Sequence, residues 1–504
     1  MNKKQIIGFA TGLIFFFFFL LGPDLKSGAP AVSHMAAIAS LMAVLWITEA
    51  IPLAATSLLP LVLYPLFGLL SGDRTAESYI NSTIFLFLGG FIIALAMEKW
   101  NLHKRVALKI ILLTGSSPDR IILGFLLASA FISMWISNTA TAMMMLPVGM
   151  AVISQIETQA GKENTKNFSI GVLLSIAYGC SIGGIMTLIG TAPNLSFIQK
   201  MNLLFPAAPK IAFGAWMQVM VPLGIIELII AWLLITKVIF RNDNRHSVQI
   251  NVIRNEYKSL GKPSYEEKVI GFIFLMTACL WIFRSDLNLG FAIIPGWAKL
   301  FPTAAFLNDG TVAMFSALLL FMVPARDKEK SHMLIEPDVF PKIPWDIILL
   351  FGGGFALARG FVESGLSLFI GEQFKAMHFS DPIYMIFIVA IIITFLTELT
   401  SNTATCEMVL PVLAAVSVAL NMNPLLLMIT ATISVSMAFM LPVATPPNAI
   451  VFGSGRISVY NMAKTGFVLN IVFAAIITLF VYFVATQVFS IDLNSMPAWA
   501  MPKQ

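Results

Sequence analysis

The chain of 504 residues is 58% hydrophobic, and its 31 Lys and Arg and 26 Asp and Glu residues together make up only 11% of it. Soluble domains carry about 25% charged residues, so this composition excludes a soluble enzyme, a nucleic-acid-binding protein and a disordered scaffold. Stretches without a charged residue, such as 50–72 and 465–491, are long enough to cross a bilayer as helices. We therefore expect an all-α polytopic membrane protein.

The apolar segments predict membrane helices and two hairpins in chain order. In the first half we expect helices near 6–22, 31–50, 52–71 and 82–98, a hairpin at 119–156, and helices at 168–199 and 211–240. In the second half we expect helices near 268–284, 305–324 and 345–371, a hairpin at 383–421, and helices at 424–455 and 465–490. The prediction is thus about eleven spans and two re-entrant hairpins.

The uncharged stretch 121–156 is too long for one membrane helix. Its 36 residues would form a straight helix of about 54 Å, whereas the hydrocarbon core of a bilayer is about 30 Å thick. Near its midpoint stands Ser137-Asn138-Thr139-Ala140-Thr141, in which Ser, Asn and Thr have poor helix propensity and tend to bond the local backbone. We therefore expect a hairpin with its tip at Asn138.

This hairpin motif occurs twice. Residues 137–141 return as Ser401-Asn402-Thr403-Ala404-Thr405, an offset of 264, and the same offset carries Gly89-Gly90-Phe91 onto Gly353-Gly354-Phe355 without a gap. Such self-similarity indicates an internal repeat.

A second pair of related segments follows the two hairpins. Residues 190–194 read Gly-Thr-Ala-Pro-Asn and residues 444–448 read Ala-Thr-Pro-Pro-Asn. Because proline interrupts a helix, each half is expected to supply one hairpin tip and one broken helix.

The basic residues indicate how the two repeats are oriented. Lys99, Lys104, Arg105 and Lys109 follow the first Gly-Gly-Phe, whereas the equivalent segment 363–373 contains no Lys or Arg. Since Lys and Arg concentrate in cytoplasmic loops, the two segments should lie on opposite sides of the membrane, which predicts an inverted-topology repeat. The same rule predicts a cytoplasmic N-terminus and a C-terminus outside an inner (plasma) membrane.

Broken helices in a membrane point to a binding site. Non-helical backbone at that depth is tolerated only where it lines a cavity or is buried in protein, and helix N-termini favour anions while free carbonyls can bind small cations. The stretches 121–156, 167–199 and 408–455 contain no Lys or Arg. A bound anion would therefore need another source of positive charge, and Na⁺ ions could supply it, which predicts cation-coupled anion uptake.

These residues resemble the divalent anion/sodium symporters, a family that carries di- and tricarboxylates or sulfate. The resemblance rests on the two Ser-Asn-Thr tips at 137–139 and 401–403, on Leu-Pro-Val-Ala-Thr-Pro-Pro-Asn-Ala-Ile at 441–450, and on Thr-Glu-Ala-Ile-Pro at 48–52. It implies an elevator-type homodimer in which a scaffold supports a moving transport domain. It also implies Na⁺-coupled uptake of C4-dicarboxylates, with an exchanger, an H⁺-coupled carrier and a sulfate symporter as alternatives.

The resemblance also implies site residues. The first Na⁺ site would consist of Ser133, Ser137, Asn138 and Gly190, and the second of Thr397, Ser401, Asn402 and Ala444. The small anionic substrate, a di- or tricarboxylate, would contact Asn138, Thr139, Thr191, Asn402, Thr403 and Pro446.

The expected domain organisation follows from the repeat and the resemblance together. The first half comprises scaffold helices 1–3 (residues 1–80) and a first repeat (81–240) with helix 4, the inner hairpin, a broken helix and helix 6. A cytoplasmic linker (241–267) follows. The second half comprises its own scaffold helices (268–343) and a second repeat (344–504) with helix 9, the outer hairpin, a broken helix and the last helix. The linker, polar and mixed in sign, is expected to be a solvated loop.

Three charged residues within the predicted spans could have functional roles. Glu398 and Glu407 flank the second tip, where the first half has Met134 and Met143, and either carboxylate could relay protons, whereas Glu398 could instead bond the backbone. Arg359 is expected to snorkel or to pair structurally rather than to bind substrate. No Ser/His/Asp, His/Glu or Cys/His set falls within the spans, so we do not expect an enzyme. The low charge content likewise predicts no nucleic-acid partner.

Overall fold

The computed structural model describes residues 3–241, 251–288, 290, 292–374, 381–493 and 495–501. Within these ranges the protein is almost entirely helical, and its one small sheet pairs β1 (Leu287–Asn288) with β2 (Ile293–Ile294) in antiparallel register. Eight helices in the described part are long and apolar enough to cross a membrane. The predicted all-α membrane class is confirmed, whereas the count of eleven spans and the re-entrant course of the hairpins stay predictions.

The helices follow the predicted order with some subdivisions. The first half contains α1 (Lys3–Leu21), α2 (Pro30–Thr48), α3 (Leu53–Thr56), α4 (Leu59–Leu66), α5 (Gly72–Ala76), α6 (Ser82–Lys99), α7 (Leu102–Thr114), α8 (Pro118–Ser133), α9 (Asn138–Ala160), α10 (Lys162–Ile185), α11 (Ala192–Leu204) and α12 (Phe213–Leu233), which continues as a π-helix over Leu234–Ile239.

The second half contains the remaining helices. They are α13 (Asn251–Ser259), α14 (Tyr265–Ile282), α15 (Asp309–Met322), α16 (Trp345–Glu363), α17 (Leu366–Phe374), α18 (Pro382–Thr397), α19 (Asn402–Ala419), α20 (Pro424–Ser434), α21 (Pro446–Phe452), α22 (Val459–Phe480), which continues as a π-helix over Val481–Ala485, and α23 (Thr486–Val488).

Several predicted element boundaries were wrong. The single helix expected at 52–71 is divided into α3 and α4, and the one expected at 345–371 ends at Glu363, before Gly365 with its positive φ of 78°. Glycine adopts this conformation without steric cost, which lets the chain turn into α17. The linker is not only a loop, since α13 packs against α7 and α9 with Ile253 fully buried. Linker residues 242–250 lie outside the described residues.

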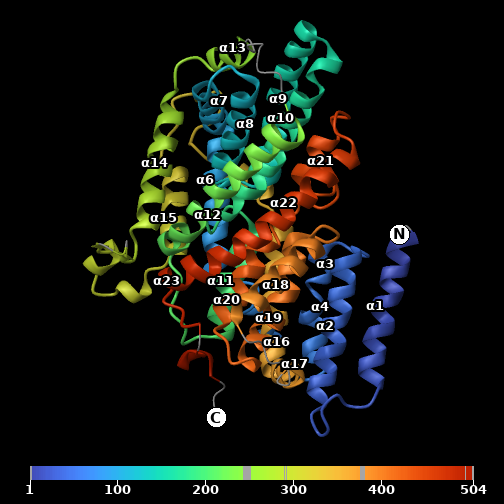
Figure 1. The fold of residues 1–504 in the computed structure, drawn as a ribbon. Coiled ribbons are helices and arrows are strands. Elements are labelled where there is room, and N and C mark those ends of the chain that lie inside the picture. The colour runs from blue at the N-terminus through green and yellow to red at the C-terminus, as the bar shows by residue number, and fades with distance from the viewer. Residues whose placement is uncertain are drawn as a thin grey trace.

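The two repeats occupy different ends of the molecule and exchange one helix each. In Figure 1, α6–α10 fill the upper part and α16–α20 the lower part. The helix α11 extends from the first repeat into the lower part, where it packs against α19 and α20, and α21 extends upward to pack against α9 and α10. Each broken helix therefore completes the half formed by the other repeat.

The helix α10 forms the centre of the upper part, and small residues allow its neighbours to approach closely. A Cβ on Gly183 would overlap the backbone of Ala130 on α8, and one on Gly179 would lie 2.6 Å from the carbonyl oxygen of Leu126. Glycines at membrane helix contacts permit such close backbone packing. This contact holds α8, and with it the chain break after Ser133, against α10.

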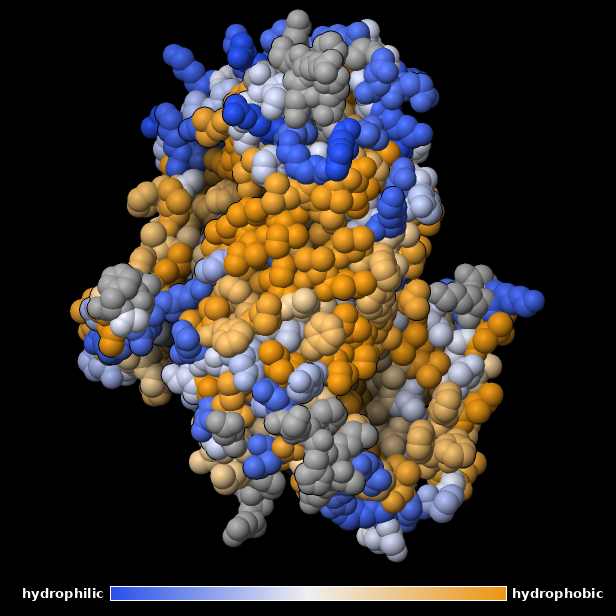
Figure 2. Space-filling view, in the orientation of Figure 1, coloured by the Kyte–Doolittle hydropathy of each residue, from blue (hydrophilic) through white to orange (hydrophobic). Residues whose placement is uncertain are grey.

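The surface has the polarity of a membrane protein. Figure 2 shows a broad band of hydrophobic residues beneath a hydrophilic cap at the upper end, and hydrophilic residues gather again near the lower edge. Large apolar side chains such as Phe18, Ile229 and Phe272 are exposed on helices. An apolar belt between polar ends fits a lipid-exposed surface.

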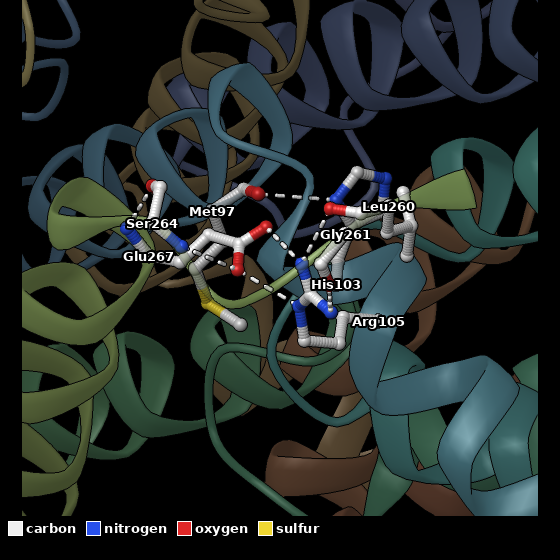
Figure 3. Close-up of polar contacts among 7 residues, drawn as sticks. All are labelled: Met97, His103, Arg105, Leu260, Gly261, Ser264 and Glu267. Carbon is white, nitrogen blue, oxygen red and sulfur yellow. Dashed lines mark hydrogen bonds and ion pairs between the residues drawn. The ribbon is translucent and has the colours of Figure 1, made fainter. Parts of the chain in front are cut away.

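A buried ion pair joins α7 to α14 at the upper end of the molecule (Figure 3). The Arg105 guanidinium donates to both carboxylate oxygens of Glu267, at 2.8 and 3.1 Å, and to the carbonyl oxygens of Leu260 and Gly261. Glu267 also completes a capping box with Ser264 at the start of α14. The arrangement fixes the end of the linker against the first repeat.

Candidate functional site

Four helix N-termini meet at one cavity of about 890 Å³. They belong to α9, α11, α19 and α21, which begin directly after the two Ser-Asn-Thr tips and the two Thr-containing helix breaks. The N-cap residues of these helices, Ser137, Thr191, Ser401 and Thr445, all line the cavity. Two segments separated by 264 residues in sequence thus face the same space.

Ten of the twelve site residues expected from the sequence line this cavity. They are Ser137, Asn138, Thr139, Gly190, Thr191, Ser401, Asn402, Thr403, Ala444 and Pro446. The other two, Ser133 and Thr397, end α8 and α18 and are fully buried behind the tips. Ser133 contacts Asn138 and Thr397 contacts Asn402, and these two asparagines line the cavity.

The first half-site gathers oxygen atoms around Asn138. The Ser133 hydroxyl donates to Asn138 Oδ1 at 2.5 Å. A Cβ on Gly190 would lie 3.0 Å from the carbonyl oxygens of Ser133 and Met134 and 2.5 Å from that of Gly184. Only glycine at position 190 therefore leaves room beside these carbonyl groups.

The chain break before Thr191 is held in place by side chains. The Thr187 hydroxyl donates to the Met134 carbonyl at 2.5 Å and accepts from the Gly190 amide at 3.1 Å. The Asn194 side-chain amide donates to the Thr187 carbonyl at 2.7 Å and to the Gly184 carbonyl at 3.1 Å. The backbone groups freed by the break are thus partly satisfied inside the protein, as a low-dielectric environment requires.

The second half-site repeats the asparagine contact with a different hydroxyl. Thr397 Oγ1 lies 2.6 Å from Asn402 Oδ1 and 2.8 Å from the carbonyl oxygen of Val435. The Asn448 side-chain amide donates to the carbonyl oxygens of Ala438 and Leu441, both at 3.0 Å. Asn448 thus has the same role at this break as Asn194 has at the other.

Glu398 organises the second break directly. Its carboxylate accepts from the backbone amides of Phe439, Met440 and Leu441 at 2.7, 2.9 and 3.1 Å, and from the Asn470 side chain at 2.7 Å. Of the two alternatives weighed for this residue, the structure matches backbone binding. Charge-assisted bonds of this kind hold an extended loop more firmly than neutral ones.

The cavity lacks a basic side chain among its described lining residues. The charged residues that line it are Glu49 and Asp346, both exposed. Positive potential therefore comes from the four helix N-termini and their free N–H groups. An anion bound here gains from these dipoles, each equivalent to about half an elementary charge, while the acidic Glu49 and Asp346 of the lining oppose it.

The oxygen atoms suit a small monovalent cation. Carbonyl, hydroxyl and side-chain amide oxygens are hard, neutral ligands of the kind that bind Na⁺ at broken membrane helices. Among the described residues there is no cluster of three or more His, Cys, Asp or Glu side chains that could hold a metal ion. The donor set therefore fits Na⁺ better than zinc or another transition metal.

Glu407 and Arg359 each form an ion pair with a different residue. Glu407 forms an ion pair with Lys200, and both side chains have 0% exposed surface. Lys200 was not predicted as a site residue, because it lies one residue beyond the uncharged stretch 167–199. Arg359 donates to the Arg74 carbonyl at 2.8 Å and to Glu77 at 3.1 Å, which agrees with the structural role expected for it.

Comparison with known proteins identifies the family. Residues 3–490 match the family described as the sodium:sulfate symporter transmembrane region. The chain is 44% identical over 500 residues to the sodium-dependent dicarboxylate transporter SdcS of Staphylococcus saprophyticus, covering 98% of this chain and 94% of that protein. The SdcS protein of Staphylococcus aureus is also 44% identical, over 498 residues and with the same coverage.

Two solved transporter structures share the fold at low sequence identity. MtrF of Neisseria gonorrhoeae aligns with a TM-score of 0.57 and 12% identity over 88% of this chain and 87% of its own. The YdaH transporter of Alcanivorax borkumensis aligns with a TM-score of 0.56 and 11% identity over 84% and 89% of the two chains. The match of residues 3–490 to the family model and the 44% identity to SdcS over 98% of the chain show that this chain belongs to the sodium:sulfate symporter family.

Proposed function

We propose that this protein is a secondary active transporter that couples Na⁺ entry to the uptake of C4-dicarboxylates of the succinate, malate and fumarate class. The observation that carries the proposal is the meeting of both Ser-Asn-Thr tips in one cavity of about 890 Å³. That volume lies within the usual range of small-molecule pockets, about 300–1,000 Å³. The two SdcS relatives, named as sodium-dependent dicarboxylate transporters, support the choice of ion and substrate.

Each repeat would hold one Na⁺ ion. The first site would use Ser133, Ser137, Asn138 and Gly190, and its support is the group of carbonyl oxygens around Gly190. The second would use Thr397, Ser401, Asn402 and Ala444, supported by the matching contact between Thr397 and Asn402. Bound Na⁺ at both sites would add two positive charges beside a cavity whose charged lining residues in the described chain are acidic.

The substrate would lie between the two tips. Its carboxylates would contact Asn138, Thr139, Thr191, Asn402, Thr403 and Pro446, all of which line the cavity. Side-chain amide and hydroxyl groups can donate hydrogen bonds to a carboxylate and so orient it without a basic side chain. Since the anion's charge would be balanced mainly by the ions, removing Na⁺ should remove most of its affinity.

Transport would follow an elevator movement within a homodimer in the inner (plasma) membrane. The scaffold would comprise residues 1–80 and 268–343, and the repeats 81–240 and 344–504 would carry the site, joined by the cytoplasmic linker 241–267. The exchange of α11 and α21 between the repeats supports a transport unit that moves as one body, because neither half of the cavity is complete alone. The N-terminus would be cytoplasmic and the C-terminus outside.

Uptake by proteoliposomes tests the function. We expect radiolabelled succinate to accumulate under an inward Na⁺ gradient and not when choline replaces Na⁺. Uptake indifferent to Na⁺ would instead identify an exchanger or an H⁺-coupled carrier. Sulfate is the second candidate substrate, since the description of the matching family names it, and sulfate that accumulates while succinate does not would decide in its favour.

A further inference from the structure

A buried ion pair connects the two repeats beside the cavity. Lys200 on α11 pairs with Glu407 on α19, and the Lys200 ammonium also donates to the Ser196 hydroxyl at 3.0 Å. Both charged side chains are fully buried. Two charges are rarely retained in such an environment unless they pair, because removing an unpaired ion from water is costly.

The pair joins the two helices whose starts line the cavity from opposite repeats. Thr191 caps α11 and Ser401 caps α19, and both residues line the cavity. Glu407 follows Ser401 by six residues and Lys200 follows Thr191 by nine, which places them about 9 and about 14 Å along their helices. The long Lys200 side chain can span the difference, since side chains lean toward the helix N-terminus.

A third helix holds the pair from outside. The Lys200 ammonium lies 5.2 Å from the ring centre of Phe355 on α16. A Cβ at the neighbouring Gly354 would overlap the Glu407 carboxylate. With Ser196 on one side and α16 on the other, the ion pair has little freedom to change its geometry.

The mirrored helix pair lacks this contact near the cavity. By the offset of 264, Met143 of α9 is the equivalent of Glu407. The helix α9 is instead joined to the segment just after α21 by an ion pair between Glu157 and Arg456. Glu157 lies 20 residues beyond Ser137, about 30 Å along α9.

We propose that Lys200 and Glu407 form a positioning pair that sets the spacing between Thr191 and the Asn402–Thr403 tip, and thereby the affinity for the anion. The pair contacts neither substrate nor Na⁺. Its effect passes along α11 and α19 to their first turns, which line the cavity. The proposal rests on the function proposed above, because the affinity in question is that for a dicarboxylate.

Conservative variants test positioning while both charges remain. Lys200→Arg and Glu407→Asp change the reach of each side chain, so we expect the KM for succinate to rise about tenfold while kcat stays within about twofold. The double variant Lys200→Met/Glu407→Met removes both charges, copies Met143, and should fold, since apolar replacement of a buried pair is often neutral. Its succinate KM should remain raised although its melting temperature equals that of wild type.

The distal ion pair provides the matched control. Glu157→Met/Arg456→Met removes the same charges far from the cavity and should leave the KM for succinate within about twofold of wild type. A wild-type KM in Lys200→Met/Glu407→Met would overturn the proposal and leave the pair a purely structural clamp. A KM raised equally in the distal double variant would also overturn it.

A distance measurement keeps the proposal testable apart from transport. Spin labels at the exposed Asn202, near the end of α11, and Asn421, just after α19, report the spacing of these helices. We expect a shifted or broadened distance distribution in Lys200→Met/Glu407→Met and an unchanged one in the distal control. A distance distribution that is unchanged in both double variants would overturn the proposed positioning role of Lys200 and Glu407. A lack of Na⁺-dependent uptake in the wild-type protein would overturn only the proposed function.

Discussion

Asn138 and Asn402 begin equivalent helices, and each holds its side-chain oxygen against a hydroxyl group five residues earlier in the chain. The partner is Ser133, at 2.5 Å, in the first repeat and Thr397, at 2.6 Å, in the second. Both hydroxyl groups belong to fully buried residues that end the preceding helix. Each asparagine is therefore fixed in orientation from behind while it lines the cavity in front.

Alanine at either asparagine should abolish most uptake. Asn138→Ala and Asn402→Ala each remove the Oδ1 atom from one proposed Na⁺ site, and we expect succinate uptake to fall at least tenfold, or by about 1.4 kcal/mol of binding free energy or more. In the residual activity, the Na⁺ titration should be less steep than in wild type. Asn202→Ala, exposed and outside the cavity, is the control. Two variants with normal Na⁺ steepness would rule out one ion per repeat.

Removing the charge of Glu398 should loosen the second helix break. Glu398→Gln keeps the size of the side chain but places an amide group among backbone N–H donors, so we expect a loss of roughly 2–3 kcal/mol in stability and much lower uptake. The shape of the pH profile of the remaining uptake should not change. A profile that loses one limb in this variant would identify Glu398 as a proton relay instead. Thermal unfolding and uptake between pH 5 and 9 provide the comparison.

The cavity lining was predictable because its motifs are duplicated. One Ser-Asn-Thr would have indicated little, but the same residues at a constant offset of 264 predicted two equivalent tips, and both line one cavity. The helix α7 was not predicted, since at 13 residues it is too short for a strong periodic signal, and the 9-residue α17 was not separated from the helix expected at 345–371.

The buried charges were less predictable, because their partners are distant in sequence. Glu398 binds amides 41 to 43 residues away, and Glu407 pairs with a lysine 207 residues earlier. No local pattern distinguishes such carboxylates from proton relays. Only the packing of α11 against α19 brings Lys200 to Glu407 and excludes water from the pair.

Breaking the ion pair between α7 and α14 should destabilise the protein without altering the site. Arg105→Met leaves the carboxylate of Glu267 buried and unpaired, at a cost of about 3–5 kcal/mol. Arg105→Lys keeps the charge but cannot reproduce the two-pronged contact and should be intermediate. We expect lower melting temperatures in that order, with an unchanged KM for succinate in the protein that folds. Lys109→Met, exposed on the same helix, should melt like wild type.

The predicted inverted orientation of the repeats implies opposite labelling of equivalent surface positions. Lys109 on α7 and Gln373 on α17 are separated by the repeat offset of 264 and are both exposed, and Figure 1 shows the two helices near opposite ends of the molecule. In a variant without Cys180, Cys279 and Cys406, a cysteine at position 109 should react with a membrane-impermeant maleimide only from the cytoplasmic side. One at position 373 should react only from outside. Labelling of both from one side would mean that the repeats are parallel, and the positive-inside argument would then fail for this chain.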